Sequence, residues 1–167
     1  MRKKTGEKSA AGVGALAGAV LALAFAGIGA AGIAGAQERP PGPYDEQIGY
    51  VGMTLADLIA RFGAPTEARA ARGAEEWQDD VVFVYPQGDF YLHRDRVWQV
   101  GLGSVHGMRV GDQSAVAHLV LGEGAQNYGD FLVYRLQPLA GSGWPVSLRV
   151  NFSAGRIAAI FIYRPDF

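Results

Sequence analysis

Cysteine is absent from this 167-residue chain. Its absence excludes a disulfide framework, a thiolate nucleophile and a lipidated cysteine behind a leader segment, so packing of the core must stabilise the fold. Histidine is scarce, with three in the chain. The three are His93, His106 and His118, and none has a partner at metal-ligand spacing. We therefore predict no metal site and no cofactor.

Catalytic signatures are missing as well. Gly141-Ser142-Gly143 does not complete the Gly-x-Ser-x-Gly pattern of a nucleophile elbow and is typical of a flexible loop. The acid pairs Glu75-Glu76 and Asp79-Asp80 are adjacent in the sequence, as in solvated turns, whereas paired catalytic carboxylates must face each other across a substrate. We therefore predict no catalytic residue, and an envelope hydrolase is the least favoured of three function classes.

The first 36 residues are typical of an export signal. A basic stretch over residues 2–8 precedes a run without charge over 9–36, which ends in Ala34-Gly35-Ala36 before Gln37. Small residues at these positions fit signal-peptidase cleavage. The alternative is a retained membrane anchor, because the apolar run is long enough to cross a bilayer. Both alternatives predict an extracytoplasmic protein, periplasmic or secreted, whose only membrane contact is through residues 1–36 if they are retained.

The rest of the chain, residues 37–167, changes character. All three lysines precede it, and it carries 11 arginines against 15 acidic residues. This mixed, mildly acidic balance lacks the basic stripe of a nucleic-acid binder, so nucleic acid is excluded as a partner. Closely spaced prolines over residues 37–47 predict an extended tether before the folded domain.

A motif occurs twice in the folded part. Gly52 is followed by Gly63 eleven residues later, and Gly111 is followed by Gly122 at the same distance. Each interval predicts a short helix that ends at its second glycine, with positive φ there. In the first helix Thr54 is placed to cap, and Leu55, Leu58, Ile59 and Phe62 form the apolar side. We predict a first repeat over 48–104 and a second over 105–167.

Strand-rich sequence follows each helix. Alternating β-branched and aromatic residues predict strands at 67–72, 80–85, 89–93 and 96–102, then at 130–136, 146–152 and 156–163. Short connections favour antiparallel pairing. The predicted fold class is α+β: two tandem α-β-β-β(-β) repeats form one continuous antiparallel sheet, with the helices packed on one face.

This pattern resembles two known families. A helix between glycines followed by an antiparallel meander, present twice, is similar to the tandem-repeat fold of the beta-lactamase inhibitor protein family. It also resembles the single unit of the SmpA/OmlA outer-membrane assembly lipoproteins, and Trp77-Gln-Asp-Asp-Val-Val-Phe looks like uncharacterised exported bacterial proteins. The resemblance implies fold positions only, at Gly52, Gly63, Pro65, Gly111 and Gly122. The chain departs from both families in having no cysteine.

Alternation predicts which side chains share a face. The covered face is assigned these residues: Phe90, Leu92, Trp98, Val100, Leu102, Val146, Leu148, Val150, Phe152, Ala158, Ile160 and Ile162. The open face receives Val97, Ser147 and Ile157 and seven candidate binding residues: Tyr91, His93, Gln99, Arg149, Asn151, Phe161 and Tyr163. Aromatic, arginine and amide groups are the composition that anchors protein interfaces. An alternative is a plain solvated face, or one covered by the tether.

The predicted function is non-enzymatic. We expect an exported binding or adaptor module that recognises another envelope or secreted protein through the open sheet face. The alternative is a carrier of a small ligand or cell-wall fragment in the groove between the repeats. Inhibition of a beta-lactamase would follow from fold analogy alone.

Overall fold

The computed structural model describes residues 41–73, 79–139 and 141–167. The predicted export signal at 1–36, the start of the tether and the Glu75-Glu76 pair lie outside these residues. The described helices are α1 (Asp45–Ile48), α2 (Leu55–Phe62) and α3 (Ser114–Leu121), the last followed by a 3-10 turn at Gly122–Gly124. None of the helices among these residues is long and apolar enough to cross a membrane.

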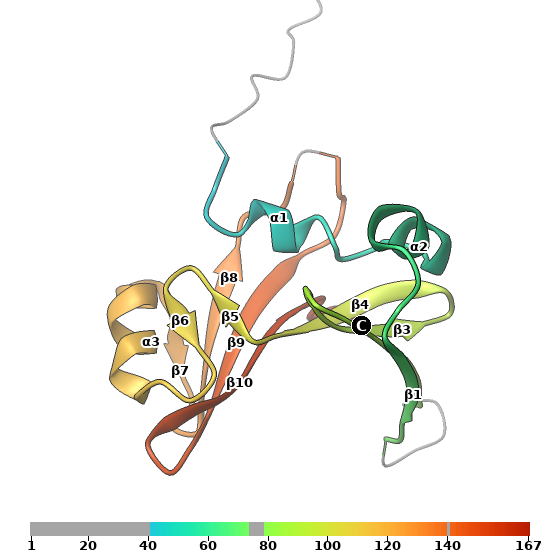
Figure 1. Cartoon of the computed structure of the whole chain (residues 1–167). Coiled ribbons are helices and arrows are strands. Elements are labelled where there is room, and N and C mark those ends of the chain that lie inside the picture. Colours follow the sequence, from blue (N-terminus) through green and yellow to red (C-terminus); the bar gives the residue numbers. More distant parts are fainter. Residues whose placement is uncertain (1–40, 74–78, 140) are drawn as a thin grey trace, which may run out of the picture. The chain divides into compact units, whose positions relative to one another are not determined.

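Within the described residues, eight strands form one antiparallel sheet in the order β1-β2-β3-β4-β10-β9-β8-β7 (Figure 1). The bounds are β1 Glu67–Ala71, β2 Asp80–Tyr85, β3 Gly88–His93, β4 Arg96–Leu102, β7 Gln126–Asn127, β8 Phe131–Leu136, β9 Val146–Ser153 and β10 Arg156–Tyr163. A separate hairpin joins β5 (Ser104–Val105) to β6 (Met108–Arg109). The predicted α+β class and the continuous antiparallel sheet are confirmed.

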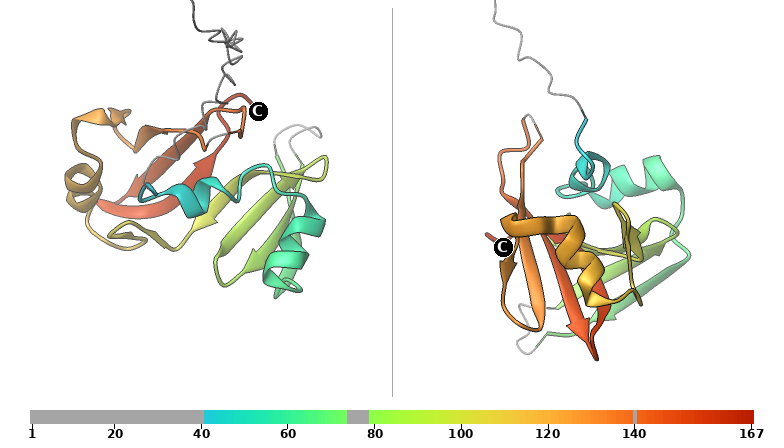
Figure 2. Two further views of the ribbon diagram at one scale, coloured as in Figure 1. Left: turned by 90° about the horizontal axis from the view of Figure 1, so that it is seen from above. Right: turned by 90° about the vertical axis from the view of Figure 1, so that its left-hand side faces the viewer.

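The helices cover one face of this sheet. Helix residues of one buried cluster are Ile48, Leu58, Ala117 and Leu121. The same cluster contains alternate residues of strands from β3 to β10, among them Phe90, Val100, Leu132, Leu148, Val150, Ile160 and Ile162. In Figure 2, α2 lies beside the green strands and α3 beside the orange ones. None of the described helices lies over the opposite face of the sheet, and we call it the open face.

Helix α2 follows its sequence pattern closely. Thr54 accepts a hydrogen bond from the backbone of Asp57, and the Asp57 carboxylate accepts one from the backbone of Thr54. Leu58 is fully buried, but Ile59, assigned to the apolar side, is 47% exposed. Ile59 lies one position around the helix from Leu58, at the rim of a helix of only two turns.

The start of the domain differs from the prediction. Residues 45–47 were expected in an extended tether, but α1 occupies Asp45–Ile48. Tyr44, Ile48 and Tyr50 are buried in the core. The Tyr44 ring contacts those of His106 and Tyr134, and the Tyr50 and Phe90 rings lie 5.5 Å apart. Burial of aromatic surface therefore outweighs the local proline-rich composition.

One set of hydrogen bonds anchors α2 to the sheet. The backbone of Gly52 donates to the carbonyl of Val97 at 2.8 Å, and Val97 donates back to Met53 at 2.9 Å. The Arg96 guanidinium donates to the Gly52 carbonyl at 2.9 Å. Three bonds thus tie the segment before α2 to the start of β4.

The same set occurs 59 or 60 residues later. Gly111 donates to the carbonyl of Ile157 at 2.8 Å, and Ile157 donates back to Asp112 at 2.8 Å. The Arg156 guanidinium donates to the Gly111 carbonyl at 2.7 Å. We call α2 with β1–β4 the first half and α3 with β7–β10 the second half.

Both helices end as predicted. Gly63 has φ 80° and ψ −159°, and Gly122 has φ 62° and ψ −158°. Each C-cap glycine donates its backbone N–H to the helix carbonyl four residues earlier. The predicted positive φ at these two glycines is confirmed, and this backbone region is almost restricted to glycine.

Two β-bulges change the predicted faces. In β4, Leu92 of β3 pairs with Val97 and Tyr91 pairs with Gln99, so Trp98 is an extra residue. In β10, Phe152 of β9 pairs with Ile157 and Asn151 pairs with Ala159, so Ala158 is the extra residue. Each bulge shifts the alternation by one residue.

The face assignments of four residues were therefore wrong. Val97 and Ile157 were predicted on the open face but are buried in the core, at 0% and 1% exposure. Trp98 and Ala158 were predicted on the covered face, but Trp98 contacts open-face groups and Ala158 is exposed.

The centre of the sheet is symmetric in its register. Gly101 of β4 pairs with Phe161 of β10, and the flanking pairs are Leu102 with Ile160 and Val100 with Ile162. With residues 60 apart treated as equivalent, Gly101 and Phe161 correspond to each other, and the two flanking pairs interchange. The two halves therefore join through the pairing of β4 with β10, which we call the central ladder, and this pairing has local twofold symmetry.

Candidate functional site

Five of the seven candidate residues lie in two adjacent rows across the open face. In the first row, Tyr91 of β3 pairs with Gln99 of β4, which pairs with Tyr163 of β10. In the second row, Phe161 of β10 pairs with Arg149 of β9. The Tyr91 and Phe161 rings contact each other edge to face at 6.4 Å. The structure thus brings residues of both halves together at the central ladder.

The other two candidates lie at the ends of this surface. Asn151 of β9 accepts a hydrogen bond from Arg149 Nε at 2.7 Å, which fixes the arginine side chain. His93, at the end of β3, lies 3.8 Å from a carboxylate oxygen of Asp80, and its ring is 5.1 Å from that of Phe167. His93 therefore belongs to a separate cluster.

That cluster is formed by the last residues of the chain. After β10, the backbone of Arg164 donates to the Trp98 carbonyl at 2.9 Å. The Arg164 guanidinium makes two bonds to the Asp166 carboxylate, at 3.1 and 3.0 Å, and lies over the Trp144 ring at 4.9 Å. Phe167 stacks on Trp98, with ring centroids 5.3 Å apart. We call residues 164–167 the tail; it covers part of the first half's open face.

Asp80 lies beneath this tail cluster. Its carboxylate accepts a hydrogen bond from Trp98 Nε1 at 3.0 Å, and its side chain is only 10% exposed. Burial raises the pKa of Asp80, and this effect exceeds the opposing effects of the Trp98 hydrogen bond and the nearby His93. The cluster thus holds a partly desolvated acid between two aromatic groups.

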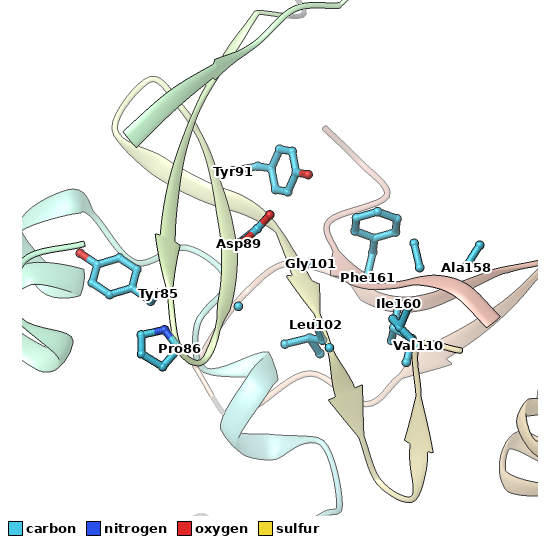
Figure 3. Close-up of a pocket in the computed structure, with 13 residues that line it drawn as sticks. Tyr85, Pro86, Asp89, Tyr91, Gly101, Leu102, Val110, Ala158, Ile160 and Phe161 are labelled. Carbon is cyan, nitrogen blue, oxygen red and sulfur yellow. The ribbon is translucent and has the colours of Figure 1, made fainter. Parts of the chain in front are cut away.

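A hollow lies at the junction of the two halves (Figure 3). Its volume is about 400 Å³, and Figure 3 shows Tyr91, Asp89 and Phe161 around Gly101, which has no side chain to cover the strand. The pairing of β3 with β4 ends at Asp89 and Gly101, while β4 runs on to Leu102. The hollow therefore reaches past the end of β3 to apolar side chains such as Leu102.

A second hollow, which we call the arginine groove, lies on the second half and has a volume of about 470 Å³. It is lined by Gly124, Gln126, Tyr128, Phe131, Val133, Arg135, Ser147, Arg149, Tyr163 and Pro165. The Arg149 guanidinium lies over the Phe131 ring at 4.0 Å. Burial raises the pKa of Tyr163, and the Arg149 charge opposes that rise. Two arginines and three aromatic rings therefore share one groove.

Several groups in these sites have no direct signal in the sequence. Phe131, Tyr128 and Arg135 were not candidates, although Phe131 and Arg135 lie an even number of residues apart on the predicted strand 130–136. The pairing of that strand with the strand of Arg149 would have identified Phe131 and Arg135 as neighbours of Arg149. Trp98 and Asp80 required knowledge of the bulge and of the tail, which no local pattern reveals.

No acid or histidine cluster indicates a metal centre in the described parts of the chain. Among those residues, no group of three or more histidine, aspartate or glutamate side chains is close enough to hold a metal ion. Of the predicted turn acids, Asp79 forms an ion pair with Arg72, and Asp80 lies in the tail cluster.

Comparison with known proteins gives little. No protein-family model matches the chain, and no curated protein matches it. The fold is similar to the crystal structure of an extracellular protein containing a SCP domain from Bacillus anthracis str. Ames, with 12% sequence identity and a TM-score of 0.44. The match covers 78% of this chain and 49% of that protein, so the chain spans about half its length. The resemblance to the beta-lactamase inhibitor and SmpA/OmlA families stays a prediction.

Proposed function

We propose that this protein is an exported, non-enzymatic binding module that recognises another extracytoplasmic protein through its open sheet face. The observation that carries the proposal is the row arrangement of Tyr91, Gln99, Tyr163, Phe161 and Arg149 on neighbouring strands of both halves. Half-buried aromatic and arginine side chains grouped at the centre of a surface are typical of interface hot spots. Export is supported by the sequence of residues 1–36.

Site-specific photocrosslinking in the native cell envelope tests this function. Benzoylphenylalanine in place of Tyr91 or Phe161 is expected to give a discrete adduct with one partner protein. Leu119 on α3 is the matched control, because it is 84% exposed and belongs to a helix on the covered side. Absence of an adduct from the open face, or an equal adduct from Leu119, would reject the proposal.

A specific observation favours a second function, the carriage of a small ligand. The hollow around Gly101 lies between the two halves, and its volume falls within the range of about 300 to 1,000 Å³ for ligand sites. A carrier purified from its native envelope should retain a small molecule detectable by native mass spectrometry. Gly101→Leu, which fills the hollow, should abolish retention of the small molecule. The crosslink from Phe161 to a partner protein should be only partly weakened by the same change.

We also propose that the two halves are copies of one α-β-β-β-β unit. Three observations support this duplication: the equivalent backbone bonds at Gly52 and Gly111, the equivalent bulges, and the symmetric central ladder. The matched arginines Arg96 and Arg156 should then be interchangeable in energetic terms. Arg96→Gln and Arg156→Gln are each expected to cost about 1 kcal/mol in urea denaturation, through loss of a charge-assisted hydrogen bond. A neutral effect at one site and a large one at the other would contradict equivalence.

A further inference from the structure

The arginine groove contains a guanidinium whose position is fixed but whose charge has no counterion among the described residues. Arg149 Nε donates to Asn151, and the Arg149 guanidinium plane lies over Phe131. Within the described residues, no acidic side chain forms an ion pair with Arg149 or with Arg135. Both arginines line the same groove. Two neighbouring positive charges without a carboxylate create a local positive potential on a chain that is otherwise mildly acidic.

The register places the two arginines close together. Arg149 of β9 pairs with Val133 of β8, and Arg135 lies two residues further along β8. Such diagonal neighbours on one face are separated by about 7 to 8 Å. Phe131 and Asn151 form the next pair of this face on the side of Arg149 away from Arg135, and the Arg149 side chain contacts both of them. The two arginines therefore offer two separate positions for carboxylates along the groove.

The tail shows the same arrangement with its carboxylate present. Arg164 also lies over an aromatic ring, that of Trp144, and it holds the Asp166 carboxylate through two hydrogen bonds. The next residue, Phe167, packs on the face through its ring. Arg149 over Phe131 is the equivalent arrangement without an acid. The tail thus contains an aromatic-supported arginine that binds an acid two residues further along the same segment, while the apolar residue after that acid packs on the sheet.

The dimensions of the groove suit a peptide. Its lining residues come from all four strands β7, β8, β9 and β10, with Gln126 near one end and Pro165 near the other. Four strands spaced by about 4.8 Å extend over about 14 Å, which is the length of about four residues of extended chain. Tyr128, Phe131 and Tyr163 provide rings along this length for apolar contacts.

We propose that the arginine groove binds an extended acidic segment of the partner protein, with its carboxylates held by Arg149 and Arg135. This inference rests on the proposed function, since it names the chemistry of the partner segment at the second half of the open face. The aromatic rings of the groove receive the residues that flank these acids.

A pair of peptides tests the charge requirement. The probe is fluorescein-labelled Glu-Asp-Tyr-Glu-Asp-Phe-amide, and its counterpart Gln-Asn-Tyr-Gln-Asn-Phe-amide differs only in charge. Binding to the full-length chain in a neutral detergent is measured by fluorescence anisotropy. We expect the acidic peptide to bind at least about tenfold tighter than the neutral one, with affinity that falls as salt increases. Equal binding of the two peptides would overturn the proposal.

Matched arginine variants test the site. Arg149→Gln and Arg135→Gln should each weaken the acidic peptide by about tenfold or more, and Arg149→Lys should lose part of that affinity because lysine lacks the planar fork. Arg94→Gln is the control, because it removes the same charge from the exposed turn between β3 and β4. A loss of equal size with Arg94→Gln would show that overall charge alone acts, and would overturn the proposal.

Two further readouts separate this inference from neighbouring ones. Free N-acetylglutamate should compete only at concentrations far above those of the peptide; equal competition per molecule would identify a small-anion site and reject a peptide segment. If Arg149→Gln leaves peptide binding unchanged while Tyr91 and Phe161 still give their crosslink, the groove assignment fails and the proposed function stands. If Tyr91 and Phe161 give no crosslink even when both arginines are intact, the proposed function itself is rejected.

Discussion

The two halves of the molecule make equivalent hydrogen bonds before their helices but differ in what covers their open face. Gly52 with Arg96 and Gly111 with Arg156 make the same bonds to the sheet. On the first half, the tail packs over Trp98 and His93, and Arg164 forms an ion pair with Asp166. On the second half, Arg149 has a supporting ring but no acid within the described chain. Backbone contacts therefore define the fold, while the side chains of the open face are free to differ.

The first and largest expected difference is between two equivalent glycines. A Cβ on Gly52 would lie 2.3 Å from Cζ2 of Trp144, whereas a Cβ on Gly111 meets nothing within 4 Å. Both have left-handed φ, at +90° and +98°. Gly111→Ala should therefore cost about 1 kcal/mol for the backbone alone. Gly52→Ala should cost about 2 to 4 kcal/mol, because overpacking against Trp144 adds to it.

Urea denaturation of both variants measures this difference. The Trp144→Ala background is the control, since removing the ring should bring the cost of Gly52→Ala down to that of Gly111→Ala. Equal costs in the unaltered background would show that the contact between Trp144 and the Gly52 segment does not distinguish the halves.

The second prediction concerns the covered and uncovered faces. Phe167→Ala removes a stacked ring from Trp98 and should cost about 1 kcal/mol in thermal or urea denaturation. Arg135→Gln, in the open groove, should change stability by less than about 0.5 kcal/mol. The NMR signal of the Trp98 indole N–H should move in the first variant only. A larger cost for Arg135→Gln would mean that the groove is a structural element.

The sequence predicted most of the elements because each has a local signal. Thr54 with Asp57 begins α2, Gly63 ends it, and alternation places Phe90 and Val150 in the core. The predicted face assignments were wrong where a β-bulge adds one residue to a strand. At Val97 the bulge is specified by hydrogen bonds to Gly52 and Met53, 44 or more residues earlier in the chain, and strict alternation contains no information about such a partner.

The site was predicted in part for the same reason. Tyr91, Arg149 and Phe161 were assigned to the open face by alternation within strands that have no bulge at those positions. The groove around Arg149 also requires the order of strands β7 to β10, which is a tertiary property. The tail's position over Trp98 is likewise set by contacts far apart in the sequence.

The third prediction compares the starts of the two helices. Thr54 forms a reciprocal capping box with Asp57, whereas Gln113 makes no side-chain cap at α3. Thr54→Ala should cost about 1 kcal/mol, and Gln113→Ala should be nearly neutral. Gln113→Thr should gain about 0.5 kcal/mol by supplying the missing acceptor. Guanidinium denaturation checks all three variants, and a loss at Gln113→Ala equal to that at Thr54→Ala would remove this difference between the halves.

The fourth and smallest effect is a pH dependence with opposite signs at two acids. Burial raises the pKa of Asp80 in the folded state, so folding favours its neutral form. The contribution of this group is fully present below the unfolded-state pKa and is lost as the pH rises through the higher folded pKa. The backbone and hydroxyl of Thr54 instead lower the pKa of Asp57, so its contribution is present above the unfolded pKa and is lost as the pH falls through the folded one.

Asparagine variants isolate the two contributions. The free energy of unfolding is measured in urea from pH 3 to pH 7 for the unaltered chain, Asp80→Asn and Asp57→Asn. The stability of Asp80→Asn relative to the unaltered chain should rise with pH, because the variant no longer loses stability when the buried carboxyl ionises. That of Asp57→Asn should fall with pH, because the variant lacks the bonded carboxylate. The same sign for both variants would show that folding lowers the pKa of Asp80, and hence that burial beneath the tail does not dominate the environment of this carboxyl group.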